Sequence, residues 1–183
     1  VRHIAERELE RYIRDRVSGT LGWSTWSFGY KNTEAGKHTP GGGGIAIRGS
    51  DMLRFLYMLF HGGKWGDQQV VPAEYVSHCS KASPYNPHYP YSLQFTVNST
   101  GHAPELADDA YWKAGSGGHA LYVVPSLDMV VWKLGGRDEQ YGEKNTGLPE
   151  VETGDDREGW VKQVEEGEGL RKTLEMVVDA VQS

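Results

Sequence analysis

The segment from Tyr111 to His119 carries the residue types and spacing best suited to chemistry. It reads Tyr-Trp-Lys-Ala-Gly-Ser-Gly-Gly-His, so a lysine, Lys113, is followed directly by small residues. Glycines near the end of a strand leave the backbone open to close approach, because they carry no side chain. An extended acyl substrate could add to such a strand edge, and a backbone N–H there could stabilise a developing oxyanion. The segment therefore predicts one wall of an acyl-transfer site, with Lys113 as its cation.

Two simpler interpretations of the same residues stay open. Lys113 taken alone is a surface lysine at a strand end. Ser116 and His119 could belong to a catalytic triad with an aspartate, but the sequence contains no Gly-x-Ser-x-Gly elbow to support one. A serine in a glycine-rich turn more often has a conformational role.

Metal and phosphate chemistry find little support in the sequence. The seven histidines and the single cysteine show no pairing with the spacing of metal ligands. The glycine run at 41–44 lacks the Lys-Ser/Thr that follows in a phosphate-binding loop. We therefore predict no metal and no cofactor.

Four apolar runs in the second half predict the strands that would position this segment. They cover residues 91–97, 110–113, 119–124 and 129–134. The last two are joined by a short turn, Pro125-Ser126-Leu127-Asp128, which is typical of an antiparallel hairpin.

Helical periodicity predicts helices at both ends of the chain and in its middle. The first expected helix covers residues 4–17, with Ile4, Leu9, Tyr12, Ile13 and Val17 on one face, and the second covers 51–61, with Ser50 as N-cap and Met52, Phe55, Leu56 and Leu59 buried. The third covers 72–80 and begins at Pro72. A terminal helix carries Leu170, Leu174, Val177, Val178 and Val181 on its apolar face. Polar or glycine-rich stretches at 31–44 and 137–168 predict a loop and an exposed acidic excursion. Helices segregated from antiparallel strands indicate an α+β fold.

Composition narrows the classes of partner. The chain has 183 residues and a net charge of −6, without a cluster of Lys and Arg, which argues against nucleic acid. No run approaches the roughly 18 apolar residues that span a bilayer. Cys79 is the only cysteine, so an internal disulfide is excluded and the redox compartment stays undetermined. Because the first residue is Val rather than Met, we expect a processed chain or a piece of a longer one.

The 111–119 segment resembles the Lys-Thr-Gly strand of the penicillin-recognising serine hydrolases, and most closely their class C β-lactamase and esterase branch. The flanking sequence agrees in order and spacing. The matching stretches are Leu21-Gly22-Trp23, Gly41–Ile45, Ser50–Phe55, Gly62–Trp65 with Val70–Pro72, and Val123–Val131. The likeness covers residues 4–136 and the final helix. It implies an antiparallel sheet flanked by helices, β-lactamase- or transpeptidase-like and incomplete, with all 183 residues forming the C-terminal portion of one domain.

The resemblance also implies roles for residues of this segment. Lys113 would bind a substrate carboxylate or polarise the catalytic hydrogen bonds, and the backbone N–H of Ser116 would supply half of the oxyanion hole. Gly115 would keep the strand edge clear, while Gly117 and His119 would line the cleft. Ala114 replaces the usual Thr, which removes a substrate-binding hydroxyl and favours esters or amides over β-lactams.

One part of the family pattern is missing. No lysine has a serine three residues before it, so the Ser-x-x-Lys that supplies nucleophile and base is absent. Tyr30-Lys31-Asn32 imitates the Tyr-x-Asn motif, but it follows the Leu-Gly-Trp turn instead of preceding it, and we interpret it as a coincidence.

The missing motif leaves three hypotheses. The chain is part of a serine hydrolase that forms an acyl-enzyme, with the nucleophile outside these residues. Alternatively, it is an inactive binding or scaffolding module of the same fold, or a half-protein that assembles with a separate N-terminal half. The resemblance implies a secreted or periplasmic protein, although no secretory signal opens this chain.

Overall fold

A computed structural model describes residues 2–28, 39, 43–87, 89–115, 119–134 and 168–182. The chain forms two compact units, Val1–Ala73 and Glu74–Ser183. The expected acidic excursion at 137–168 and most of the expected loop at 31–44 lie outside the described residues.

The first unit begins with short helical segments instead of the single helix predicted over 4–17. They are α1 (Arg2–Ala5), α2 (Leu9–Ile13) and the π-helical η1 (Arg14–Ser18). Glu6 has a φ of 53°, and a left-handed residue cannot continue a right-handed helix. The predicted apolar face is also wrong in part, since Ile4 is 92% exposed and Tyr12 is exposed as well.

Helix α3 (Gly49–Phe60) is the central element of this unit, and it confirms the helix predicted over 51–61. Met52, Leu56 and Leu59 are buried as predicted, together with Met58, while Phe55 is half-buried. The prediction that Ser50 caps the helix is wrong, because extended Arg48 occupies the cap without a side-chain bond.

Two small two-stranded sheets flank α3 in the sequence, and neither was predicted. The strands β1 (Ser27–Phe28) and β2 (Ile45–Ala46) pair antiparallel, as do β3 (Lys64–Trp65) and β4 (Gln68–Gln69). Gly62 and Gly63 end α3 with φ values of 65° and 83°. A Cβ at Gly63 would lie 2.1 Å from the carbonyl oxygen of Val71, so the chain requires glycine there.

Asp51 joins the first turn of α3 to the aromatic loop at residues 22–26. Its carboxylate accepts hydrogen bonds from the Ser24 hydroxyl at 2.6 Å and the Ser24 backbone N–H at 2.9 Å. Arg54 donates to the same carboxylate at 3.3 Å and to the carbonyl of Gly22. Asp51 is buried, yet the Ser24 hydroxyl bond holds the pKa of its carboxyl below the ordinary value, outweighing the opposing effect of burial. The loop and the helix are therefore fixed to each other by one ionised side chain.

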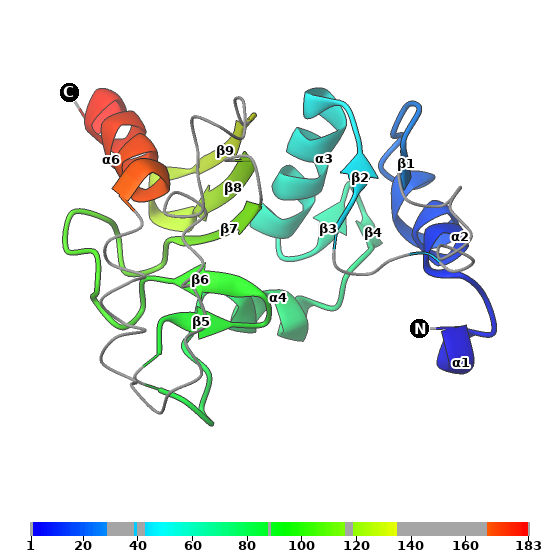
Figure 1. Cartoon of the computed structure of the whole chain (residues 1–183), viewed down its shortest axis with the longest axis horizontal. Coiled ribbons are helices and arrows are strands. Elements are labelled where there is room, and N and C mark those ends of the chain that lie inside the picture. Colours follow the sequence, from blue (N-terminus) through cyan, green and yellow to red (C-terminus); the bar gives the residue numbers. More distant parts are fainter. Residues whose placement is uncertain are drawn as a thin grey trace. The chain divides into compact units, whose positions relative to one another are not determined.

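The second unit is built on a five-stranded antiparallel sheet in the order β5-β6-β7-β8-β9 (Figure 1). The strands are β5 (Tyr91–Ser92), β6 (Phe95–Val97), β7 (Tyr111–Gly115), β8 (His119–Val124) and β9 (Met129–Lys133). The predicted hairpin after residue 119 is confirmed, with the 3-10 turn η3 (Pro125–Leu127) and a left-handed Asp128 between its strands. Helix α4 (Ala73–Cys79) follows Pro72, close to the predicted position.

The single strand predicted over 91–97 is wrong. Leu93 and Gln94 have φ values of 48° and 73°, and together they turn the chain so that β5 pairs back onto β6. Two successive residues with positive φ are the backbone of a type I′ hairpin turn. The turn escaped prediction because neither residue is the glycine or asparagine that normally marks one.

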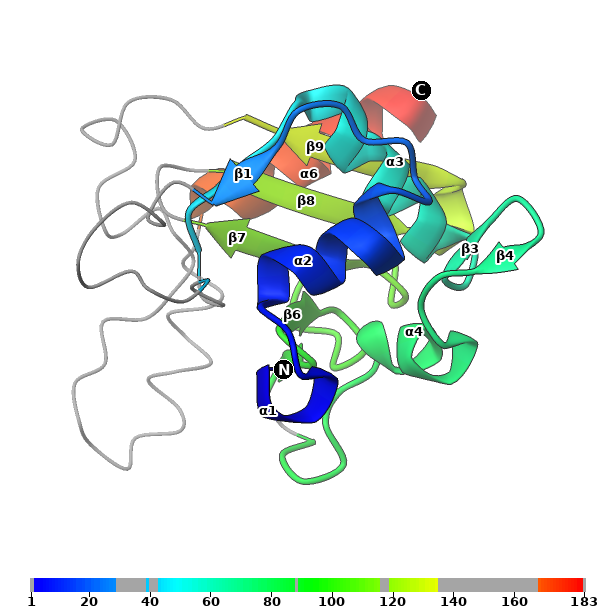
Figure 2. The same ribbon diagram turned by 90° about the vertical axis from the view of Figure 1, so that its right-hand side faces the viewer.

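One face of the sheet carries the main core of the second unit. Helix α6 (Glu168–Gln182) lies along β8 and β9 (Figures 1 and 2) and buries Leu174 and Val178, as predicted. The core also contains Ala103, Leu106, Ala110, Trp112, Ala120, Tyr122 and Val124. Val181 is 58% exposed and lies outside this core, contrary to the prediction. Within the described part of the chain, no helix combines the length and apolar character that a membrane span requires.

Asn98 organises the loop between β6 and β7 from a fully buried position. Its Nδ2 lies 2.9 Å from the carbonyl oxygens of Ala103 and Leu106 and 3.1 Å from that of Ala107. Its Oδ1 accepts the backbone N–H of Ala103 at 3.0 Å. The carbonyls of Ala103 and Ala107 also accept backbone N–H bonds within the loop, so Asn98 matters most to the Leu106 carbonyl and the Ala103 N–H, since buried backbone groups need a partner. The Asn98 contacts also occupy the amide of the sequon Asn98-Ser99-Thr100, so attachment of a glycan at Asn98 is incompatible with this fold.

Candidate active site

The end of β7 has an unpaired edge in the described residues. The strand pairs with β8 along its whole length, from Tyr111 to Gly115. On its other side it pairs with β6 only at Tyr111 and Trp112. Among the residues that the structure describes, no strand pairs with this side of residues 113–115, which is the geometry that an added extended peptide or acyl chain needs.

Lys113 lies at the start of this edge, and its ammonium group is held in place. Its Nζ donates a hydrogen bond to the Tyr91 hydroxyl at 3.1 Å, and the same nitrogen lies 5.5 Å from the centre of the Tyr91 ring. Both residues are half-buried. Tyr91 was not among the predicted site residues, because its contact with Lys113 depends on the unexpected turn at 93–94 that brings β5 next to β6.

The register of the sheet separates the predicted site residues onto two faces. Directly opposed residues of antiparallel strands point to the same face. Lys113 opposes Leu121 and Gly115 opposes His119, so these four residues share one face. Ala114 points to the other face and packs against the core beneath α6. The structure therefore brings Lys113, Gly115 and His119 together and places the Ala114 side chain apart from them.

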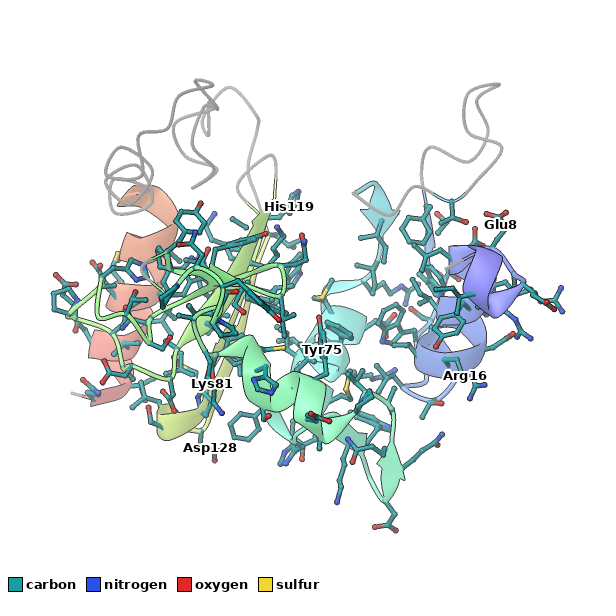
Figure 3. The ribbon with its side chains drawn as sticks, turned by 90° about the horizontal axis from the view of Figure 1, so that it is seen from below. Glu8, Arg16, Tyr75, Lys81, His119 and Asp128 are labelled. Atoms are coloured by element: carbon teal, nitrogen blue, oxygen red, sulfur yellow. The ribbon has the colours of Figure 1, made fainter. Side chains whose placement is uncertain are left out.

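His119 extends an aromatic surface from this face of the sheet. Its ring stacks on Trp132 of β9, with centroids 6.1 Å apart and an interplanar angle of 11°. Trp132 opposes Leu121 across the β8–β9 pair, which puts it on the Lys113 face. His119 is exposed at the end of β8 opposite to Asp128 (Figure 3). Ser116 and Gly117 lie outside the described residues, so their predicted roles stay predictions.

Because the sequence lacks Ser-x-x-Lys, Cys79 is a conceivable substitute nucleophile. Its surroundings argue against that role. The side chain is fully buried, and its Sγ lies 3.5 Å from the carbonyl oxygen of Tyr75. Burial raises the pKa of the thiol to about 11, where a reactive cysteine has a lowered value. Among the described residues, no three His, Cys, Asp or Glu side chains gather in a group that could hold a metal ion.

We expect Cys79 to resist alkylation in the folded protein. Raising the thiol pKa from 9.0 to about 11, a difference of 2 units, lowers the thiolate fraction near pH 8 about 100-fold, and burial blocks access to what remains. Iodoacetamide at pH 8 should label the chain only after urea is added, as followed by intact mass. Complete labelling of the native chain within minutes would contradict the buried position of Cys79.

Comparison with known proteins supports the fold. No protein-family model matches the sequence, and no curated protein does. A solved structure, described as a "putative beta-lactamase from Bacteroides dorei DSM 17855", is similar with a TM-score of 0.53 and 20% sequence identity over 73% of this chain. The match covers 45% of that protein, so the chain spans less than half of its length. The fold is α+β and β-lactamase-like, as predicted.

Proposed function

We propose that this chain supplies one wall of the acyl-transfer site of a serine hydrolase that acts on esters or amides. The observation that carries the proposal is the unpaired edge of β7 at residues 113–115, with the Lys113 ammonium held beside it by Tyr91. The β-lactamase-like fold is consistent with this function.

In the proposed reaction, the acyl part of the substrate lies along the edge of β7 as an additional strand. A serine attacks the carbonyl carbon while a base takes its proton, and the C=O electron pair moves onto oxygen. Collapse of this intermediate expels the alcohol or amine, which takes up that proton, and leaves an acyl-enzyme that water then hydrolyses to the free acid and the serine. The Ser116 N–H would face the developing oxyanion. Lys113 would bind a carboxylate of the substrate through a charge-assisted hydrogen bond.

The nucleophile in this proposal comes from residues outside these 183. No serine of the chain is followed by lysine three positions later, and Cys79 is buried with a raised pKa. The same absence favours a second candidate function, an inactive binding or scaffolding module. The nucleophile could come from an N-terminal part of a longer chain or from a separate N-terminal half that assembles with this one, and both would place the serine beside β7.

Labelling with a fluorophosphonate, which marks activated serines, separates these functions. The 183-residue chain alone should remain unlabelled. The natural protein that contains these residues, alone or in complex, should be labelled at a serine in a Ser-x-x-Lys motif if it is an enzyme. Labelling of the isolated chain would overturn the proposal, and a natural protein without labelling would favour the binding module.

Lys113→Met in the labelled natural protein tests the role of the wall. Loss of a charge-assisted hydrogen bond should slow hydrolysis of an activated ester that bears a carboxylate at least about tenfold. The matched variant Lys81→Met removes an exposed lysine that Figure 3 places apart from His119, and it should have no effect. Equal rates for both variants would show that Lys113 does not touch the substrate.

A further inference from the structure

The face of the sheet that carries Lys113 also carries a flat aromatic surface, and the two lie on one line across three strands. Lys113 on β7 opposes Leu121 on β8, and Leu121 opposes Trp132 on β9. We propose that this face binds a planar aromatic ring bearing a carboxylate, with the carboxylate on Lys113 and the ring on the stacked pair His119 and Trp132. The inference rests on the proposed function and names the class of acyl group that the site accepts.

The spacing suits such a ligand. Lys113 and Trp132 are two strands apart, and two strand spacings place their backbones about 10 Å from each other. Both side chains are long, and Leu121 lies half-buried between them as an apolar floor. The Tyr91 bond draws the Lys113 ammonium toward β5, so a bicyclic aromatic carboxylate would cross β7 and β8 to contact the ammonium at one end and the rings at the other.

The charged end of the site is oriented before a ligand arrives. An ammonium group has three N–H donors, and the bond from Lys113 to Tyr91 uses one of them. The Tyr91 contact also restricts a side chain that is otherwise flexible, which reduces the entropy lost when an anion binds. Two donors of Lys113 can then serve a carboxylate.

The rings of His119 and Trp132 should favour ligands with a planar ring. The rings of His119 and Trp132 are nearly parallel, and His119 is exposed. A second ring that stacks on this pair gains more than a puckered ring of the same size, because stacked aromatic contacts add about two- to twelvefold in binding beyond burial of area. The site should therefore distinguish planar from saturated acyl groups.

The test compares 2-naphthoate with decahydro-2-naphthoate, which has the same carbon skeleton without the planar rings. Binding to the 183-residue chain is followed by the indole N–H signal of Trp132 in ¹H–¹⁵N NMR spectra, assigned with the variant Trp132→Phe. We expect 2-naphthoate to shift this signal and to bind at least about twofold more tightly than the saturated acid. His119→Ala should remove this preference, while His78→Ala, at an exposed histidine of α4, should keep it.

The variant Lys113→Met separates failure of this inference from failure of the proposed function. If both acids bind equally well and both are weakened at least tenfold by Lys113→Met but not by Lys81→Met, the aromatic selection is wrong and the anion-binding wall stands. If neither acid depends on Lys113, the inference and the role of Lys113 in the proposed function are both wrong. A preference for naphthoate that persists in His119→Ala also overturns the inference.

Discussion

Replacing Asn98 with alanine is expected to lower the free energy of unfolding of the second unit by about 3–5 kcal/mol, since each buried backbone group left unpaired costs about 1–3 kcal/mol. Four backbone groups bond to this side chain: the carbonyls of Ala103, Leu106 and Ala107 and the N–H of Ala103. The carbonyls of Ala103 and Ala107 also accept the backbone N–H groups of Leu106 and Ala110 at 3.0 Å, so alanine deprives the Leu106 carbonyl and the Ala103 N–H of the bonds that Asn98 makes to them. Ala103 and Leu106 belong to the core beneath α6, so the loss should spread from the loop into the core.

Urea denaturation followed by circular dichroism measures this loss, and hydrogen exchange at residues 98–110 shows where it begins. Asn98→Asp keeps the shape of the side chain but directs an oxygen, in place of the amide N–H groups, at three carbonyl oxygens. It should therefore be at least as destabilising as alanine. The control is Asn86→Ala, at an exposed asparagine, which should change stability by less than about 0.5 kcal/mol. Equal stability of Asn98→Ala and Asn86→Ala would show that the loop does not depend on the buried amide.

Replacing Asp51 with alanine is expected to lower the free energy of unfolding of the first unit by about 3–4 kcal/mol, because hydrogen bonds to charged groups contribute about 1.5–3 kcal/mol each. The substitution removes both bonds from Ser24 and leaves Arg54, which is itself partly exposed, without its carboxylate. The aromatic loop should loosen first, since Ser24 is bound to Asp51 and directly follows Trp23, whose ring contacts Phe55 of α3. Faster hydrogen exchange at residues 22–26 than at 111–124 would locate the effect.

The contribution of Asp51 should also depend on pH, in a direction that follows from its pKa. The folded state holds the pKa of this carboxyl below its ordinary value of 3.8, chiefly through the Ser24 hydroxyl. A lowered pKa means that the stabilisation is complete above the pKa of the unfolded chain and is lost as the pH falls through the lower, folded value. The difference in unfolding free energy between the native chain and Asp51→Asn should therefore be constant near pH 7 and shrink below pH 4.

Asp67→Ala provides the matched control, because Asp67 is exposed in the turn between β3 and β4. Its unfolding free energy should follow that of the native chain at every pH. A native-minus-Asp51→Asn difference that grows on acidification would mean that the carboxyl is not stabilised in its ionised form.

Local patterns were sufficient for several elements of this protein. Apolar alternation and a short turn predicted the β8–β9 hairpin, and helical spacing of Met52, Leu56 and Leu59 predicted α3. Both signals arise between residues that are close in the chain, where side-chain period reports directly on which face is buried. The lysine followed by small residues likewise predicted the end of a strand, and β7 ends at Gly115, with residues 113–115 unpaired on one side within the described part of the chain.

Local patterns failed where the backbone adopts a conformation that its residues seldom favour. Glu6, Leu93 and Gln94 all have positive φ without being glycine or asparagine. They break the predicted N-terminal helix and the predicted strand over 91–97. Single-residue preferences cannot reveal such positions, because contacts elsewhere in the unit offset the local strain.

The strand that carries Lys113 shows the same division. By itself, the sequence determined that a lysine followed by alanine and glycine ends a strand, and that no Ser-x-x-Lys accompanies it. Only the tertiary structure decided that Tyr91 holds the lysine, that Ala114 faces the core, and that His119 stacks on Trp132. The Tyr91 contact joins β5 to β7, and the His119 contact joins β8 to β9. Such cross-strand contacts depend on a pairing register that no local period encodes.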